Sequence, residues 1–304
     1  MTQHDFPLGH VARMGDLPRV VDLIPSASPN QCSRALQYAA ENGHADCVKA
    51  LIPYSDPTAH NHWALFMAAA KGNLECVRLL APFASAEEIS TPLGWAAGQG
   101  HLECVHHLSA LTSDYHVAVR QAAENGRVEC LQFLLSLIPS PNPSSLSGDW
   151  ALVDACTHGH TECVKLLLAW RPPRSENIPG LLEAAHGGHV ECVKLLIPLL
   201  SPDVDHTQAL VNAARGHLEC VKLLIPLCDP TAHKSEALFV AVVEGFVDCI
   251  EALFPVSNPT VVGKRLQAAK RIEVSEHGRN KFEQMLLKNA TAHAAPQRAA
   301  ARKL

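Results

Sequence analysis

The sequence has few large or charged side chains. Of its 304 residues, 5% are aromatic and 18% are charged, while 47% are apolar. This composition can supply a buried core and excludes a disordered chain. No segment approaches the roughly 18 uninterrupted apolar residues of a membrane helix, and the first residues lack the basic and apolar segments of a secretory signal. We therefore expect a protein that is made and kept in water, without a transmembrane segment.

Positive charge is also scarce over most of the chain. The formal net charge is −5 and the pI is about 6.4. A nucleic-acid binder would need a wide basic field, so we expect no specific nucleic acid as partner. From residue 260 onward, however, ten Lys or Arg residues stand against three Glu residues. This basic segment could dock on an acidic partner, an anionic membrane or nucleic acid, or could only aid solubility, which we favour.

One repeated pattern dominates what the sequence does contain. Near-constant text surrounds a recurring glycine, as in ALQYAAENGHADCVKALIP at 35–53 and GLLEAAHGGHVECVKLLIP at 180–198. The linker DPTAH also occurs twice, at 56–60 and at 229–233. Successive glycines are 26 to 33 residues apart, so the repeat is about 29 residues long. The glycines are Gly15, Gly43, Gly72, Gly100, Gly126, Gly159, Gly188, Gly216 and Gly245.

Each repeat predicts two short helices. In the first half, an anchoring Leu is followed by Ala three and four residues later, as in Leu36, Ala39 and Ala40, which gives one apolar helical face. The glycine ends this helix because it reaches the left-handed conformation without steric cost. A second helix carries Cys, Val and Leu and stops at a proline such as Pro53. Polar residues three positions before the anchor are predicted to cap the first helix: Ser33, Ser90, Asp149, Thr207 and Ser235.

Such short helix pairs cannot bury their apolar faces alone, so neighbouring pairs must stack. We therefore predict an all-α helical solenoid of about nine helix–turn–helix repeats. Residues 1–30 are a degenerate N-terminal capping repeat, and 31–256 form the main solenoid. Residues 257–289 are a C-terminal capping repeat that closes with a helix at 281–289, and 290–304 are a disordered basic tail.

The longest connection covers residues 136–149 and contains three prolines. It is either a projecting loop or a slight break between two sub-stacks. We favour the loop, because the repeat resumes in register after it.

The segment AAGQGHLECV at 96–105 resembles the ankyrin repeat, and the resemblance extends over about residues 8–270. It implies a curved stack of helix pairs whose inner helices and loop tips bind other proteins, usually without chemistry. Ankyrin repeats run about 33 residues and open with Thr-Pro-Leu-His. Here the units are about four residues shorter, and only Thr91-Pro92-Leu93 keeps that opening. The missing residues fall where ankyrin repeats project a β-hairpin finger, so we expect shortened or absent fingers.

Eleven cysteines raise the question of redox or metal chemistry. Eight of them lie four residues after the repeat glycine, at equivalent positions of helices about 8–10 Å apart, which is too far for disulfides along the stack. We interpret them as small apolar residues of the core. An odd number of thiols also indicates a reducing compartment, so we expect the cytoplasm, with a host cytosol or nucleus as alternatives. The eight are Cys47, Cys76, Cys104, Cys130, Cys163, Cys192, Cys220 and Cys249.

Other reactive side chains recur without forming a recognisable site. A histidine follows five of the glycines, but two ligands per repeat cannot build a four-ligand zinc site, so we expect no metal and no cofactor. The imidazoles are predicted to bond backbone groups at the turn. Acidic residues begin each second helix, with a basic residue three positions on in most repeats, which is typical of a solvated surface. Because no catalytic motif is present, we do not expect an enzyme.

Candidate contact residues lie on the first helices. At the second position after the anchor, early repeats carry Tyr38, Met67 and Trp95, whereas later repeats carry mainly polar residues. If this position faces the concave surface, the three form an aromatic and apolar patch for a partner; alternatively, they fill space between layers. The ends of the first helices correspond, by the resemblance, to positions that often contact ligands: Glu41, Asn42, Lys71, Gln99, Glu124, Asn125 and His158.

The leading hypothesis is a non-enzymatic protein–protein interaction module. It would act as a monomeric scaffold and bind a protein or peptide partner on its concave helical face. The alternative hypothesis is an adaptor tethered to an anionic partner or membrane through its basic C-terminal segment. Salt should separate the two hypotheses, because only the second depends mainly on charge.

Overall fold

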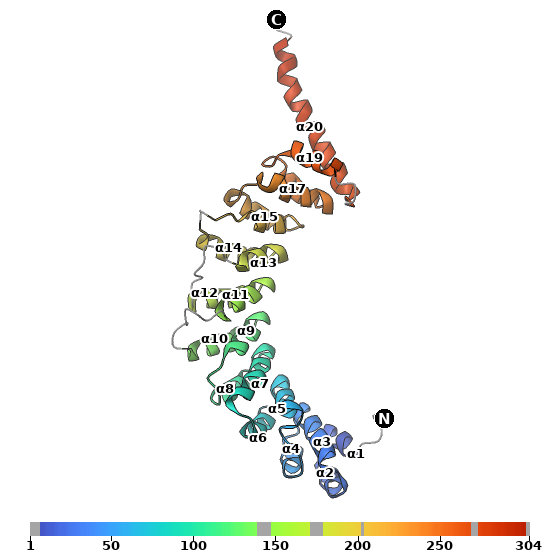
Figure 1. Cartoon of the computed structure of the whole chain (residues 1–304), viewed down its shortest axis with the longest axis vertical. Coiled ribbons are helices and arrows are strands. Elements are labelled where there is room, and N and C mark those ends of the chain that lie inside the picture. Colours follow the sequence, from blue (N-terminus) through green and yellow to red (C-terminus); the bar gives the residue numbers. More distant parts are fainter. Residues whose placement is uncertain (1–6, 139–146, 171–178, 202–203, 269–272, 302–304) are drawn as a thin grey trace. The chain divides into compact units, whose positions relative to one another are not determined.

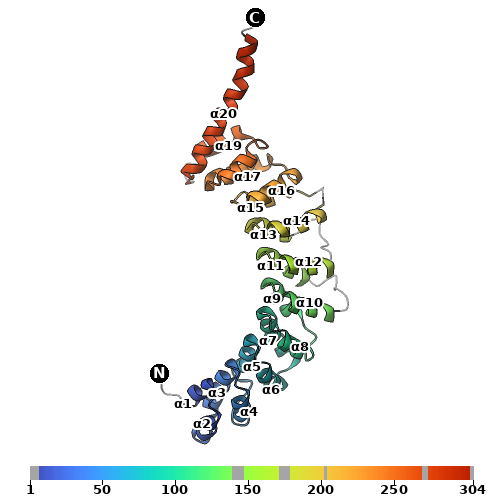
Figure 2. The same cartoon turned by 180° about the vertical axis from the view of Figure 1, so that it is seen from behind.

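The chain folds into two compact, all-helical units, shown in a computed structural model (Figure 1). Unit 1 contains residues 1–155 and 162–172, and unit 2 contains residues 156–161 and 173–304. Within each unit, the first helices of successive repeats lie side by side in chain order, as the opposite view also shows (Figure 2). The structure describes residues 7–138, 147–170, 179–201, 204–268 and 273–301.

Unit 1 is built from helix pairs that alternate a first and a second helix. Its first helices are α1 (Pro7–Met14), α3 (Pro29–Glu41), α5 (Ala59–Lys71), α7 (Ala86–Gln99), α9 (His116–Glu124) and α11 (Ser147–Thr157). Its second helices are α2 (Leu17–Leu23), α4 (Ala45–Leu51), α6 (Leu74–Leu80), α8 (Leu102–Ser109), α10 (Val128–Leu137) and α12 (Thr161–Trp170).

Unit 2 continues the same alternation. Its first helices are α13 (Pro179–Gly187), α15 (Thr207–Ala213), α17 (Ala232–Glu244) and α19 (Pro259–Ala268). Its second helices are α14 (Val190–Leu196), α16 (Leu218–Leu224), α18 (Val247–Leu253) and α20 (Glu276–Ala301). Short 3-10 turns follow five second helices and hold the prolines that end them: η1 (Ile24–Ser26), η2 (Ile52–Tyr54), η3 (Ala81–Phe83), η4 (Ile197–Leu199) and η5 (Ile225–Leu227).

The repeat glycine has two roles at the end of a first helix, as Gly72 shows. Gly72 has a φ of 76°, a left-handed conformation that favours glycine, and its amide caps α5. A Cβ at this position would come within 2.5 Å of Nδ1 of His101 in the next repeat. The glycine is therefore required both for the turn and for the close approach of the neighbouring layer.

The core is made of small and medium apolar side chains. Successive Ala pairs such as Ala96 and Ala97 are fully buried, so adjacent helices can approach closely without large aromatic residues. All eight cysteines that follow the glycines are buried, which confirms the interpretation of these residues as core. Burial raises the pKa of these thiols, to about 11 for Cys76, Cys104, Cys163 and Cys220.

The predicted loss of the β-hairpin fingers is confirmed, because no strand occurs in the part of the chain that the structure describes. The all-α solenoid of about nine repeats is confirmed as well.

The long connection at 136–149 was predicted to be either a loop or a break between sub-stacks. Most of it, 139–146, lies outside the described residues. α20 begins before the predicted closing helix at 281–289 and includes residues 290–301, where a disordered tail was predicted.

The prediction of the helix caps was wrong for several first helices. α3 begins four residues before Ser33, and Ser28 is its N-cap, paired with Gln31 in a capping box. Ser33 instead lies inside the helix, where its hydroxyl donates to the carbonyl of Pro29 and accepts from the amide of Asp56 in the next repeat at 2.9 Å. Ser235 accepts from the amide of Asn258 in the same way. These hydroxyls therefore bond one repeat to the next.

Candidate functional site: an aromatic pocket between α5 and α7

The site begins with an unusual turn at the end of the DPTAH linker of unit 1, residues 56–60. His60, Asn61 and His62 all have positive φ, between 56° and 60°, although none is glycine. Such a conformation costs about 1–2 kcal/mol per residue, so the surrounding contacts must hold it in place. The turn bends the chain at the start of α5 and sets the direction of the residues that follow.

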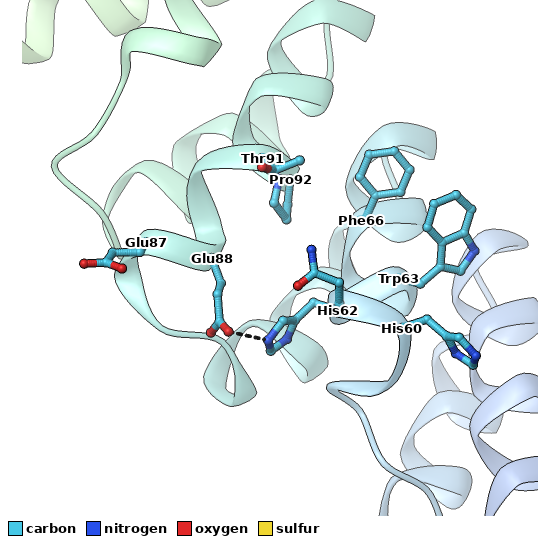
Figure 3. Close-up of a pocket in the computed structure, with 9 residues that line it drawn as sticks. His60, His62, Trp63, Phe66, Glu87, Glu88, Thr91 and Pro92 are labelled. Atoms are coloured by element: carbon cyan, nitrogen blue, oxygen red, sulfur yellow. Dashed lines mark ion pairs between the residues drawn. The ribbon is translucent and has the colours of Figure 1, made fainter.

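A cavity of about 510 Å³ lies between this turn and the first part of α7 (Figure 3). We call it the α5–α7 pocket. Its walls come from two consecutive repeats of unit 1, so it is a feature of the stacking and not of one helix. The lining residues are His60, Asn61, His62, Trp63, Phe66, Glu87, Glu88, Thr91 and Pro92.

Three aromatic rings meet at this site and form what we call the aromatic cluster: Trp63, Phe66 and Trp95. Trp63 stacks on Phe66 with ring centroids 4.9 Å apart, and Phe66 meets the edge of Trp95 at 5.3 Å. The two tryptophans are nevertheless 45% and 42% exposed. Exposed aromatic rings that touch each other across two repeats present an apolar surface to the solvent, which is typical of a binding site.

A contact between His62 and Glu88 forms one wall of the pocket. His62 is 7% exposed, and its Nε2 lies 3.0 Å from Oε1 of Glu88, as Figure 3 shows. Glu88 is also the capping-box partner of Ser85, whose amide donates to it at 2.7 Å. These bonds, with those to Ser85 first, lower the pKa of Glu88 to about 2. Glu88 is therefore a fixed negative charge at neutral pH that links the left-handed turn to the start of α7.

The exposed face continues over the next repeats of unit 1. Gly94 leaves room for Val117, because a Cβ on Gly94 would lie 2.6 Å from a methyl group of that side chain. Val117 and Trp150 are both exposed. The guanidinium of Arg120 lies 5.9 Å from the Trp150 ring and forms an ion pair with Asp154. Aromatic and apolar groups thus give way to a mixed surface along the first helices.

The structure separates the three residues of the predicted patch. Trp95 is exposed and belongs to the aromatic cluster. Tyr38 and Met67 are half-buried, and the guanidinium of Arg13 lies 4.5 Å from the Tyr38 ring. Only Trp95 of the three is therefore part of the exposed cluster, and its neighbours there are Trp63 and Phe66.

The predicted contact residues at the ends of the first helices have more than one role. Lys71, Gln99 and His158 are exposed. Asn42 and Asn125 are exposed too, but each side-chain amide donates to the carbonyl four residues earlier, so they also complete their helix ends. Glu41 and Glu124 are half-buried, and Glu124 accepts from Gln121. None of them joins the aromatic cluster.

Sequence reasoning missed Trp63 and Phe66, although a signal was present. Relative to the anchor Leu65, they occupy positions −2 and +1, and Met67 occupies +2. Residues at i, i+3 and i+4 share one helical face. The pattern of position −2 would also have revealed Trp150, two residues before its anchor Leu152. Trp63 and Trp150 were missed because only the positions after the anchor were compared between repeats.

Three of the five histidines after the glycines bond backbone groups at the turns, as predicted, and their bonds reach the preceding repeat. Nε2 of His44, His101 and His189 lies 2.9–3.2 Å from a carbonyl oxygen there. The acidic residues of the second helices form surface ion pairs, such as Lys194 with Glu191 at 2.7 Å, which contribute little to stability. Among the described residues, no group of three or more His, Cys, Asp or Glu is placed to hold a metal ion.

The comparison with known protein families decides the relationship. The family described as "Ankyrin repeats (3 copies)" matches this chain in overlapping segments: 8–89, 36–120, 93–178, 119–198 and 181–262. The chain belongs to the ankyrin-repeat family. Ankyrin repeats generally mediate protein–protein interaction, and the family is typically non-enzymatic.

Comparison with individual proteins gives less information about this chain than the family match does. The crystal structure of the human ASB11 ankyrin repeat domain is 25% identical in sequence, covers 68% of this chain and 97% of its own, and gives a TM-score of 0.48. No curated protein matches the chain. None of the helices that the structure describes is long and apolar enough to cross a bilayer.

Proposed function

We propose that this ankyrin-repeat protein is a non-enzymatic binding module, and that the aromatic cluster is the centre of its contact with a protein or peptide partner. The observation that carries the proposal is the meeting of three aromatic rings from two repeats beside a cavity of about 510 Å³, with both tryptophans more than 40% exposed. Tryptophan and tyrosine dominate the energetics of protein interfaces, because they bury a large area with few rotatable bonds.

The stacked repeats provide a rigid support for this contact. Trp63 and Phe66 follow the left-handed turn of α5, and Trp95 lies on α7, whose position is fixed by the buried residues Leu93, Ala96 and Ala97. A partner therefore meets rings that are already in place, and little conformational entropy is lost on binding. The predicted contact residues Lys71 and Gln99, which are exposed at the ends of the same two helices, would extend the interface.

The test is capture of the partner by the full chain, followed by a binding titration with the partner that is recovered. Replacing Trp63 and Trp95 together with Ala should weaken binding by about 2–4 kcal/mol, because both rings lose their contact area. Phe83→Ala is the matched control, since Phe83 is an aromatic residue of 44% exposure in η3 that belongs neither to the aromatic cluster nor to the lining of the pocket. Equal binding by the double variant and by the control would contradict the proposal.

The alternative hypothesis assigns binding to the basic C-terminal segment. In the described part of that segment, Lys281 forms an ion pair with Glu251, so its charge is already partnered. Capture that is lost steeply with added salt, and that does not depend on Trp63 or Trp95, would favour this alternative. Capture that tolerates salt would favour the aromatic cluster.

A further inference from the structure

The two units contain the same turn, which allows the α5–α7 pocket to be compared with a second example in the same chain. The DPTAH linker returns 173 residues later, so that residues 60–66 correspond to 233–239 and residues 87–92 correspond to 260–265. The backbone is the same in detail. His233, Lys234 and Ser235 have positive φ of 49–61°, like the three residues of the first turn.

In unit 2, the place that corresponds to the pocket is occupied by an arginine of the chain itself. The guanidinium of Arg265, on α19, lies 3.9 Å from the centre of the Phe239 ring. Its Nη1 donates to the carbonyls of His233 and Lys234 at 3.3 and 3.1 Å, and its Nη2 pairs with Glu236. The left-handed turn thus directs two carbonyl oxygens to a cation that also covers an aromatic face.

Unit 1 retains the groups that correspond to those around this guanidinium, but it lacks the arginine itself. Phe66 corresponds to Phe239, and the two carbonyls belong to His60 and Asn61, which line the pocket. The residue that corresponds to Arg265 is Pro92, whose short ring cannot reach across. The cavity in unit 1 therefore lies where the guanidinium lies in unit 2.

The charges and rings around the cavity also suit a guanidinium. Trp63, in the place of Glu236, stacks on Phe66, so the pair presents the outer faces of two rings, and cations are attracted to such faces. Glu87 and Glu88 replace Thr260 and Val261, so the carboxylate lost at position 63 is compensated from α7. Glu88 points toward His62 at the pocket wall, while Glu87 points away from the rings (Figure 3).

We propose that the α5–α7 pocket binds an arginine side chain of the partner, held by the carbonyls of the left-handed turn, an outer face of the stacked Trp63 and Phe66 rings, and the carboxylate of Glu88. This rests on the proposed function of the aromatic cluster and specifies the chemistry of the partner at its centre. The planar guanidinium fits the site better than an ammonium, because it can stack on a ring while its edge donates several hydrogen bonds.

The test uses the full chain and three small probes: N-acetyl-arginine amide, N-acetyl-citrulline amide and N-acetyl-lysine amide. Citrulline has nearly the shape of arginine but no charge. The indole N–H signal of Trp63, identified in NMR spectra from its loss in Trp63→Phe, should shift to saturation with the arginine probe. The citrulline probe should bind at least about tenfold more weakly, because the charge-assisted bonds and the cation–π contact are lost.

A substitution that transfers the arginine of unit 2 into unit 1 sharpens the test. Pro92→Arg should fill the pocket from within and abolish the response of Trp63 to the arginine probe. Ala110→Arg, which adds the same charge at an exposed position after α8, should leave the response in place. Melting curves confirm that both variants are folded.

Several outcomes would overturn the proposal. Equal binding of the citrulline probe, stronger binding of the lysine probe, or an unchanged response in Pro92→Arg would each exclude an arginine site. Self-association of the wild type that Pro92→Arg abolishes would make a second copy of the chain the occupant. These probes require no partner, so the two proposals can fail separately. If the arginine probe does not bind but partner capture still depends on Trp63 and Trp95, only the arginine site is refuted. If the arginine probe binds but capture does not depend on the two tryptophans, only the proposed function is refuted.

Discussion

Units 1 and 2 differ most clearly at two nearly identical turns. Both turns follow a DPTAH linker and hold three non-glycine residues in the left-handed region. In unit 2 the turn is covered by Arg265, and in unit 1 it borders an open cavity. The exchange of Arg265 for Pro92 and of Glu236 for Trp63 converts a filled site into an accessible one. We therefore propose that the repeated scaffold keeps the same backbone and uses it once for stability and once for binding.

The largest effect on stability is expected from opening the site in unit 2. Arg265→Ala removes two hydrogen bonds to carbonyls, an ion pair and a cation–π contact, and should lower the free energy of unfolding by about 2 kcal/mol. Chemical denaturation measures the loss. Arg279→Ala, at an exposed position of α20, is the control. A loss of unfolding free energy no larger than that of the control would mean that the contacts of Arg265 with the turn contribute nothing to stability.

The reverse change in unit 1 should stabilise the protein. Pro92→Arg removes a proline from the interior of α7 and supplies the contacts that Arg265 makes in unit 2, so we expect a gain of about 1–2 kcal/mol. The same denaturation experiment applies. A destabilised variant would show that the two turns do not offer equivalent surroundings to an arginine side chain.

Acid should affect unit 1 through a link that unit 2 lacks, because the residues that correspond to His62 and Glu88 are Ser235 and Val261. The pKa of Glu88 is lowered from 4.5 to about 2. Its stabilising contribution is therefore complete above pH 4.5 and is lost as the pH falls toward 2. Melting temperatures between these pH values should fall less steeply for Glu88→Gln than for the wild type.

Glu87→Gln provides the control for this pH dependence. It removes the same charge one residue away and leaves the bonds to Ser85 and His62 intact. If Glu87→Gln reduced the pH dependence of the melting temperature as strongly as Glu88→Gln does, the effect would come from overall charge and not from the link between the repeats.

The smallest effect is expected from relieving the turns themselves. Glycine adopts the left-handed conformation without steric cost, so Lys234→Gly should raise the free energy of unfolding by about 1 kcal/mol. Asn61→Gly should raise it by about half as much, because asparagine tolerates this conformation better than lysine does. Differential scanning calorimetry can rank the two variants. A loss of stability in both would mean that these turns are not strained.

The scaffold was predictable from the sequence because its causes are local and repeated. The glycine spacing, the Ala pairs and the cysteine positions each follow from a helix end or a buried face that recurs in every repeat. The absence of fingers followed in the same way from the shortened units. Nine-fold repetition makes each of these signals strong.

The candidate site was not predictable to the same extent, because it depends on what differs between repeats. No local pattern marks His60, Asn61 and His62 for a left-handed turn, since none is glycine. The start of α7 was mispredicted because Ser90 was read as its cap, although Ser85 and Glu88 have the spacing of a capping box. The pocket also needs two repeats in contact, which single-repeat patterns do not contain.

The central claim is that the α5–α7 pocket is the contact point for the partner. The most direct measurement is the affinity of the captured partner for Pro92→Arg, together with the melting temperature of that variant. We predict that affinity falls at least about tenfold while the melting temperature rises, a combination that a folding defect cannot produce. Unchanged affinity in a variant that melts at a higher temperature would contradict the claim.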